Sequence, residues 1–319
     1  MGRGNVCNEL KRHVEAFAAY DKALAIKPDF AEAWIGRGNI YRDQRNYDEA
    51  LAAQEKALVL KPGSIQAWLA RGIVLSAMGR KDEAIADYRR ALNLGGNPES
   101  LQYQIAALGG AAAPAAMPVQ MVAKLFDQYA ATFDEHLTGT LKYHVPTVLS
   151  ELVKRLIPSG PMDILDLGCG TGLVGKQVHP LARTLTGVDL SANMLARAEE
   201  LKIYDHLICS DIDQFLQTQD RTFDIAFAAD VFVYIGDLSP IFRGARQALR
   251  EGGLFCFSVE GVDSGNFVLR STLRYAHSVD YLQQLAKQNE FVLETIAPHA
   301  IRQEHELDVS GYLAIMRCK

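Results

Sequence analysis

Residues 119 to 319 alternate short apolar runs with longer stretches of helical periodicity, which is the pattern of a parallel sheet with crossover helices. The apolar runs predict seven strands, at 163–167, 184–188, 206–209, 224–228, 254–259, 291–296 and 310–317. A short polar segment joins the runs at 291–296 and 310–317, so we expect these two strands to form a hairpin. Such a hairpin would put one antiparallel strand at an edge of the sheet. The pattern therefore predicts a doubly wound, mostly parallel α/β sheet.

The first hundred residues carry a different pattern, which repeats every 34 positions. Aromatic and small residues recur at this offset: Trp34 and Trp68, Gly38 and Gly72, Ala50 and Ala84, Ala57 and Ala91. Small residues let the two helices of a hairpin approach, and Pro62 ends the second helix. This period and these residue types resemble the tetratricopeptide repeat. The resemblance implies a helical solenoid with a concave face suited to peptides.

The repeat region is expected to span residues 1–108. Because Met1 aligns with Ile35, we expect one truncated repeat, two full repeats and a closing helix at 98–108. Asn5 and Asn39 share a repeat position and resemble the ladder asparagines in the repeats of O-linked N-acetylglucosamine transferases, whose amides bond a peptide backbone. Alternatively, two repeats inherited one surface asparagine. We expect the repeats to dock an unidentified protein or peptide, or to mediate self-association.

Residues 109–118, "GGAAAPAAMP", have no helical or strand period and are expected to form a linker to a second domain at 119–319.

No run of about 18 apolar residues and no signal-peptide pattern is present in the sequence, so we expect a cytoplasmic protein without a membrane span. A net charge of -5 gives no indication of the clustered Lys and Arg residues that binding to nucleic acid requires, so no nucleic-acid partner is expected. The scattered cysteines, Cys7, Cys169, Cys209, Cys256 and Cys318, form no CxxC spacing, so neither a disulfide framework nor a metal site is expected.

A glycine-rich loop follows the strand at 163–167, with Gly168, Gly170 and Gly172 in "DLGCGTG". In a doubly wound sheet, the first strand-to-helix turn is where the backbone approaches a ligand most closely. A dinucleotide fingerprint, GxGxxG, would need glycine where this chain has Leu173. The loop therefore disfavours a nicotinamide or flavin and still allows a nucleoside.

Carboxylates accompany four successive strands: Asp166, Asp189, Asp211 and Asp230. Asp189 ends its strand 21 residues past Gly168, where a carboxylate can accept hydrogen bonds from both ribose hydroxyls. The ligand is therefore expected to contain a ribose with a free 2′-hydroxyl. The loops are acidic and short of Lys and Arg, so a cationic ligand fits them better than a pyrophosphate.

Three motifs, "LDLGCGTG", "GVDLSANML" and "CSDI", resemble those of the class I S-adenosylmethionine-dependent methyltransferases, and the resemblance covers essentially all of 119–319. It implies S-adenosylmethionine as cofactor and S-adenosylhomocysteine as product. Asp166 would lie near the ammonium group, Asp189 would hold the ribose, and Met194 would lie against the adenine. The implied cofactor-binding set is Tyr129, Tyr143, Asp166, Gly168, Cys169, Gly170, Asp189, Leu190, Met194, Asp211, Ile212 and Asp230.

The segment 119–157 looks like the N-terminal lid helices of methyltransferases that act on small molecules and some proteins. In such lids an aromatic hydroxyl often caps the cofactor, and Tyr129 is the first choice here, with Tyr143 the second. The spacing of Phe126, Tyr129 and Phe133 equally fits one apolar helix face packed on the sheet.

Methyl transfer is an in-line displacement, so the protein must mainly align the reactants and exclude water. A base is needed only where the acceptor loses a proton in the step. The catalytic candidates are Tyr234, Glu260 and His277, and the acceptor-binding candidates are Tyr234, Arg274, His277 and Arg302. Alternatively, the arginines pair with acidic groups of the protein.

The tetrapeptide NPPY and a Pro-Cys nucleophile are both missing after the fourth strand, which leaves oxygen or nitrogen of a small molecule or protein side chain as acceptor. Two alternatives stay open. The second domain could hold the cofactor without transferring methyl groups, as a non-catalytic scaffold. It could also be a nucleotide-dependent oxidoreductase, which Leu173 disfavours.

Overall fold

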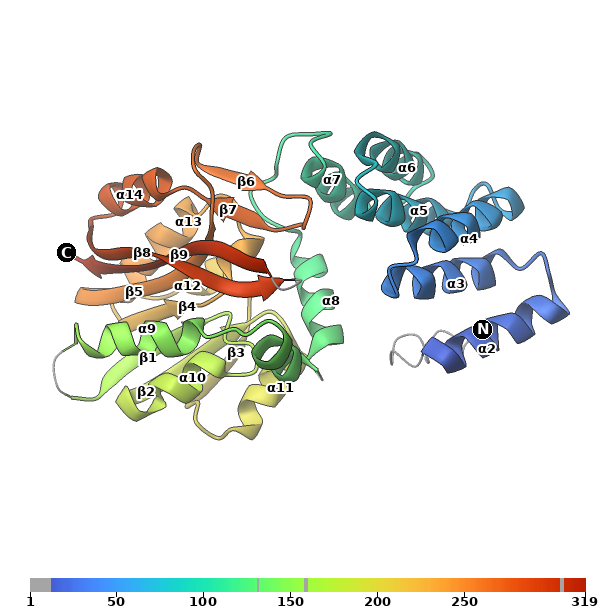
Figure 1. The fold of residues 1–319 in the computed structure, drawn as a ribbon. Helices are drawn as coiled ribbons and strands as arrows, with labels where there is room; N and C mark the ends of the chain where they lie inside the picture. Colours follow the sequence, from blue (N-terminus) through green and yellow to red (C-terminus); the bar gives the residue numbers. More distant parts are fainter. Residues whose placement is uncertain (1–12, 131, 158–159, 305–306) are drawn as a thin grey trace. The chain divides into compact units, whose positions relative to one another are not determined.

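The computed structural model describes residues 13–130, 132–157, 160–304 and 307–319 (Figure 1). The chain divides into two compact units, Met1–Ala113 and Pro114–Lys319. Asn5, Cys7 and the beginning of the first repeat lie outside the described residues.

The first unit consists of helical hairpins. Its described helices are α2 (His13–Ile26), α3 (Ala31–Asp43), α4 (Tyr47–Leu60), α5 (Ile65–Ala77), α6 (Lys81–Asn93) and the closing helix α7 (Pro98–Ala107). The repeat is visible in its contacts, since Trp34 Nε1 donates to the carbonyl of Pro28 at 3.2 Å and Trp68 Nε1 donates to that of Pro62 at 2.8 Å. The predicted helical repeats are confirmed.

Glycine brings the two helices of each hairpin together. A Cβ on Gly72 in α5 would lie 2.5 Å from the ring of Tyr88 in α6, and a Cβ on Gly38 in α3 would overlap the side chain of Gln54 in α4. Gln54 Nε2 also donates to Asn39 Oδ1 at 3.5 Å. Asn39, the ladder asparagine within the described residues, therefore contacts a side chain of its own hairpin.

The second unit contains one sheet. In the described part of the chain it has nine strands: β1 (Met162–Leu167), β2 (Ala182–Asp189), β3 (His206–Cys209), β4 (Phe223–Ala228), β5 (Leu249–Gly261), β6 (Phe267–Leu269), β7 (Tyr275–His277), β8 (Phe291–Glu304) and β9 (Leu307–Cys318). The order is β3-β2-β1-β4-β5-β7-β6, with β9 antiparallel to both β5 and β8. The predicted class, a mostly parallel doubly wound sheet after helical repeats, is confirmed.

Two details differ from the prediction. The hairpin of β6 and β7 adds two strands of three residues each, which are too short to show a hydrophobic period. The strands β8 and β9 also extend beyond their apolar runs, and β9 pairs with β5 on one side and β8 on the other. The antiparallel strand β9 is therefore internal, and β8 takes the outer position of the hairpin.

Helices cover both faces of the sheet (Figure 1). They are α8 (Val119–Tyr129), α9 (Val145–Lys154), α10 (Leu173–Val178), α11 (Ala192–Glu200), α12 (Ile212–Leu216), α13 (Ser239–Ala248) and α14 (Val279–Gln288). Ile164 packs in one core with α9 and α10, while its neighbour Leu165 packs in another with α12, α13 and α14. Successive strand side chains point to opposite faces, so a continuous apolar run fills both cores.

The second half of the predicted linker belongs to this unit. Gly236 N donates to the carbonyl of Ala115 at 2.7 Å, and Met117 N donates to that of Tyr234 at 2.8 Å. The Tyr275 hydroxyl donates to the carbonyl of Pro114 at 2.8 Å. These bonds fix residues 114–117 beside the loop that follows β4.

Candidate cofactor site

The glycine loop follows β1 and has a backbone that favours glycine. The φ angles of Gly168, Gly170 and Gly172 are 64°, 53° and 90°. A Cβ on Gly168 would also lie 2.5 Å from Cγ2 of Val231, in the loop after β4. Backbone conformation and close packing together require glycine at this position.

Asp189, at the end of β2, holds the glycine loop in place. Its Oδ2 accepts from Gly170 N at 2.9 Å and its Oδ1 accepts from Ser191 N at 2.8 Å. Burial raises the pKa of this carboxyl, and these backbone N–H groups act in the opposite direction. Each carboxylate oxygen has further acceptor capacity, so Asp189 can also accept from two hydroxyls.

Asp166 is buried in β1 and only one of its oxygens is paired. Oδ2 accepts from the Tyr204 hydroxyl at 2.7 Å, whereas Oδ1 is buried without a hydrogen-bond partner. Burial, assisted by the nearby Asp189 carboxylate, raises the pKa of Asp166 to about 7. An unpaired buried carboxylate oxygen is costly, and a cationic donor would relieve that cost.

Further predicted cofactor residues follow the ends of β1, β2 and β3. Asp211 caps α12, since its Oδ1 accepts from Asp213 N at 2.9 Å and Gln214 N at 3.1 Å. Met194 and Ile212 are buried. Cys169 is buried as well, which raises the pKa of its thiol, and the carbonyl of Leu190 accepts from the Cys209 thiol at 3.7 Å.

Helix α8 is joined to this site by polar and aromatic contacts. Asp127 Oδ1 accepts from the Ser191 hydroxyl at 2.6 Å, and the Asp127 carbonyl accepts from Asn193 Nδ2 at 3.2 Å. The ring of Phe133 packs edge to face against Tyr129 at 5.5 Å between centroids. A Cβ on Gly170 would lie 3.8 Å from that Phe133 ring, so this lid segment lies directly over the glycine loop.

Tyr143, which is buried, and Tyr234, which is half-buried, lie next to this lid. Burial, together with the Asp230 carboxylate, raises the pKa of Tyr143. Burial also raises the pKa of Tyr234, whose ring packs edge to face on Phe126 at 5.4 Å. Both tyrosines are therefore protonated at neutral pH and can donate a hydrogen bond.

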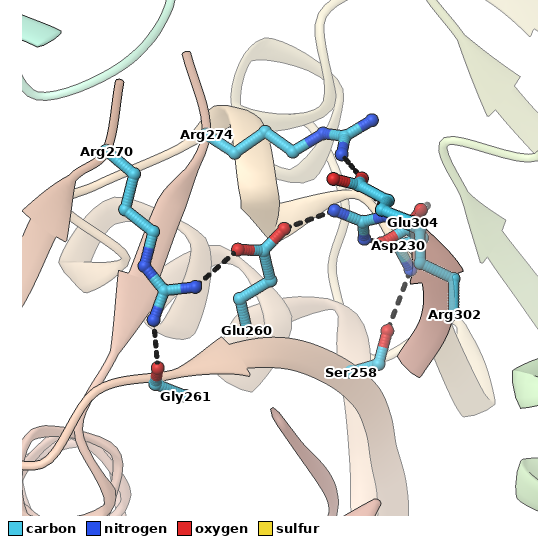
Figure 2. Close-up of polar contacts among 8 residues, drawn as sticks. All are labelled: Asp230, Ser258, Glu260, Gly261, Arg270, Arg274, Arg302 and Glu304. Carbon is cyan, nitrogen blue, oxygen red and sulfur yellow. Dashed lines mark hydrogen bonds and ion pairs between the residues drawn. The ribbon is translucent and has the colours of Figure 1, made fainter. Parts of the chain in front are cut away.

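Arg302 is the centre of an ion-pair cluster at the carboxyl ends of β4 and β5 (Figure 2). Its Nη1 donates to Asp230 Oδ1 and its Nε to Glu304 Oε1, both at 2.9 Å, and its Nη2 donates to Glu260 Oε1. The Arg302 side chain is 1% exposed. The acceptor-binding candidate Arg302 is thus fully engaged by carboxylates of the protein, as in the alternative interpretation of the arginines.

The same cluster includes two further arginines. Arg270 Nη1 donates to Glu260 Oε2 at 3.0 Å and its Nη2 donates to the carbonyl of Gly261 at 2.6 Å (Figure 2). Arg274 donates to Glu304. A cavity of about 250 Å³ adjoins the cluster and is lined by Glu260, Gly261, Arg270, Thr272, Glu304, Asp308, Val309 and Ser310.

His277 lies in the core and not in that cavity lining. Its Nε2 is 2.9 Å from the carbonyl of Ile235 and 3.1 Å from that of Gly236, and its ring is fully buried. Burial lowers the pKa of His277 to about 4, so the ring is neutral at pH 7.

Several residues of the site were not predicted from the sequence. Tyr204, in the loop before β3, has no motif around it, and its role depends on a contact across 38 residues. Ser258 accepts from Asp230 N at 2.8 Å, which supports the φ of 60° at Asp230. Of the residues not predicted, Asp127 had a usable signal, since it lies within the predicted lid segment 119–157.

Among the described residues, no group of His, Cys, Asp and Glu side chains is arranged to hold a metal ion. None of the helices in the described ranges has the length and apolar character needed to cross a bilayer.

The fold defines a doubly wound, Rossmann-like domain with a glycine loop after its first strand. Residues 165–257 match the family model described as a methyltransferase domain. Residues 29–95 match a tetratricopeptide repeat model, and residues 4–44 match a second model of that repeat. The chain therefore combines tetratricopeptide repeats with a methyltransferase domain of the S-adenosylmethionine-dependent kind.

Among curated proteins, the chain is similar to a malonyl-[acyl-carrier protein] O-methyltransferase of Bacillus anthracis, at 28% identity over 148 residues, which is 45% of this chain and 54% of the relative. The chain thus spans about half the length of the curated relatives it matches. One similar solved structure is the [4+2]-cyclase SpnF, with a TM-score of 0.54, 17% identity, and coverage of 64% of this chain and 97% of the other.

Another similar structure is the 1,6-didemethyltoxoflavin-N1-methyltransferase of Burkholderia thailandensis, with S-adenosylhomocysteine bound. Its TM-score is 0.50 at 16% identity, over 66% of this chain and 93% of that one. At these identities the structural likeness shows the fold alone.

Proposed function

We propose that the second unit binds S-adenosylmethionine and transfers its methyl group to an oxygen or nitrogen of a small-molecule or protein acceptor. The observation that carries this proposal is the pairing of Asp189 with the glycine loop, next to the unpaired Oδ1 of Asp166. The Asp189 carboxylate can still accept hydrogen bonds from hydroxyls, and the Asp166 carboxylate lacks a cationic partner. A ligand with a ribose and an ammonium group satisfies both.

The residues present fit that cofactor. Asp189 would accept from the ribose hydroxyls, and Asp166 would accept from the ammonium group. Asp211 and the backbone of Ile212 would bind the adenine edge, and Met194 would lie against its ring. When bound, S-adenosylmethionine supplies a methyl group on a sulfonium, which an oxygen or nitrogen lone pair can displace.

The protein's own contribution is alignment and exclusion of water. Phe133 lies over the glycine loop and would keep solvent from it, and Asp127 of α8 accepts from Ser191 beside the loop. Both tyrosines are protonated at neutral pH, so Tyr143 would donate to the cofactor and Tyr234 would donate to an acceptor. Glu260 is held between Arg270 and Arg302, so we assign it the role of fixing the acceptor cavity and not that of a base.

His277 is not carried into this mechanism, because its buried ring bonds backbone carbonyls. Without a base among these groups, the arrangement suits an acceptor whose lone pair is available at neutral pH. The Bacillus anthracis relative is named as an O-methyltransferase, which supports oxygen as the acceptor atom.

Incubating the protein with methyl-labelled S-adenosylmethionine and a panel of acceptors, including cell extract, tests the proposal. We expect label in an acceptor, and Asp189→Asn should abolish it while the exposed Asp220→Asn should not. Tight S-adenosylhomocysteine binding with no labelled product on any acceptor would favour the scaffold alternative. Calorimetry against NAD(H) separates the oxidoreductase, since preferential NAD(H) binding contradicts the proposal.

For the repeats we propose docking of a protein or peptide partner, or self-association. The matched repeat models and the stacked hairpins support this role. Sedimentation velocity of the full chain over a range of concentrations tests self-association, and a monomer at every concentration excludes it.

A further inference from the structure

We propose that Tyr204 is a positioning residue for the cofactor: its hydroxyl holds one oxygen of Asp166, leaves the other for the cofactor's ammonium group, and reduces the proton release that accompanies binding. This inference rests on the proposed function. It concerns a residue outside the three motifs that indicate the cofactor.

The contact itself is specific. The Tyr204 hydroxyl donates to Oδ2 of Asp166 at 2.7 Å, while Oδ1 of the same carboxyl is buried and unpartnered. A carboxyl free to rotate would present either oxygen. With Oδ2 held by Tyr204, Oδ1 is the oxygen that remains for a ligand.

Three glycines make room for the Tyr204 ring. A Cβ on Gly187 would lie 2.9 Å from Tyr204 Cε1, one on Gly172 would lie 3.1 Å from Tyr204 Cε2, and one on Gly175 would overlap the hydroxyl. Gly172 belongs to the glycine-rich loop, and Gly175 lies in α10, which follows it. In the structure their missing side chains admit a tyrosine that reaches the site from the loop before β3.

The electrostatics of Asp166 connect this contact to protons. Burial and Asp189 raise its pKa to about 7, while the Tyr204 hydroxyl and the Gly175 backbone N–H act to lower it. The other titratable groups nearby, Cys169 and Tyr143, are neutral at pH 7 because burial raises the pKa of each. An ammonium group beside Oδ1 favours the ionised carboxylate, so binding near pH 7 must displace a proton.

Calorimetry with S-adenosylhomocysteine in two buffers of different ionisation enthalpy measures both affinity and proton release, without any turnover. For the unchanged protein at pH 7 we expect release of about half a proton per site, because Asp166 is half ionised there. Affinity should rise with pH up to about 7 and then level off.

Tyr204→Phe removes only the hydroxyl. Its loss raises the pKa of Asp166 further, so at pH 7 we expect affinity to fall about tenfold and proton release to approach one. The matched control is Tyr281→Phe, which removes another buried hydroxyl that donates to a carboxylate, Asp237 Oδ1, at 3.0 Å. This control should bind as the unchanged protein does.

Asp166→Asn provides a second measurement that does not depend on the folding of Tyr204→Phe. Asparagine can still accept from Tyr204 but cannot ionise, so binding should weaken and proton release should disappear. If Tyr204→Phe and the unchanged protein bind with equal affinity and equal proton release, this inference alone is overturned. If the unchanged protein binds no S-adenosylhomocysteine, the proposed function itself fails.

Discussion

Arg302 and Asp230 lie 72 residues apart in the chain, yet Nη1 of Arg302 donates to Oδ1 of Asp230 at 2.9 Å. The pair joins the loop after β4 to the far half of β8, and Glu260 and Glu304 complete the shell around the guanidinium. The cluster is therefore built on a buried cation that carboxylates of the protein neutralise.

Removing that cation should be costly. Arg302→Met leaves Asp230 and Glu260 without their shared partner, and we expect a loss of about 3–5 kcal/mol in the free energy of unfolding. Urea denaturation measures it. Arg80→Met, which breaks an exposed pair with Glu83, is the control and should leave the free energy of unfolding nearly unchanged, because solvent screens such a pair. Equal effects of the two variants would show that the Arg302 cluster behaves as a surface pair.

The raised pKa of Asp166 makes stability depend on pH. The folded protein holds this proton up to about pH 7, whereas an unfolded chain releases it near pH 4. The free energy of unfolding of the ligand-free protein therefore decreases as the pH rises from about 4 to about 7. Asp166→Asn should therefore stabilise the ligand-free protein on the order of 2–4 kcal/mol at pH 8, and little at pH 4. Denaturation at both pH values checks this. A gain of the same size at both would assign the effect to packing and not to ionisation.

Gly175 is expected to resist replacement because of Tyr204. In a helix, Gly→Ala normally stabilises by about 0.5–1 kcal/mol, but here the added Cβ would overlap the Tyr204 hydroxyl. We expect Gly175→Ala to destabilise by about 1–3 kcal/mol, and Tyr204→Phe in the same chain to recover part of the loss. Gly63→Ala, whose Cβ would meet nothing within 4 Å, is the control. Equal unfolding temperatures for Gly175→Ala and Gly63→Ala would contradict a clash between the added Cβ at residue 175 and Tyr204.

In the repeats, Arg71 and Asp87 form a two-pronged ion pair. Nε and Nη2 of Arg71 donate to the two carboxylate oxygens of Asp87, both at 2.7 Å, and the guanidinium lies 4.8 Å from the ring of Trp68. Arg71→Lys keeps the charge but loses this fork and the stacking, and we expect a loss of about 1–3 kcal/mol. Chemical denaturation measures the loss, and Arg80→Lys serves as the exposed control. An unchanged denaturation midpoint for Arg71→Lys would show that the two-pronged geometry of the ion pair does not contribute to stability.

Local patterns in the sequence predicted the elements that depend on short-range signals. The 34-residue recurrence of Trp34 and Gly38 predicted the hairpins, and five of the apolar runs, from 163–167 to 254–259, coincide with or lie within β1 to β5. The turn after β1 and the spacing to Asp189 predicted a ribose-binding pocket, because both are set by the path of the chain within one βαβ unit. The predicted roles in cofactor binding stay predictions until binding is measured.

The sequence by itself determined the architecture and predicted the chemical kind of the cofactor pocket, since hydrophobic period, glycine spacing and strand-end carboxylates are local properties of the chain. The tertiary structure alone decided that Tyr204 holds Asp166, that Arg302 is surrounded by carboxylates, and that His277 lies in the core. Each of these depends on which side chains meet across many residues. Burial then sets the charge and the available hydrogen bonds of each group, and no spacing along the chain encodes that.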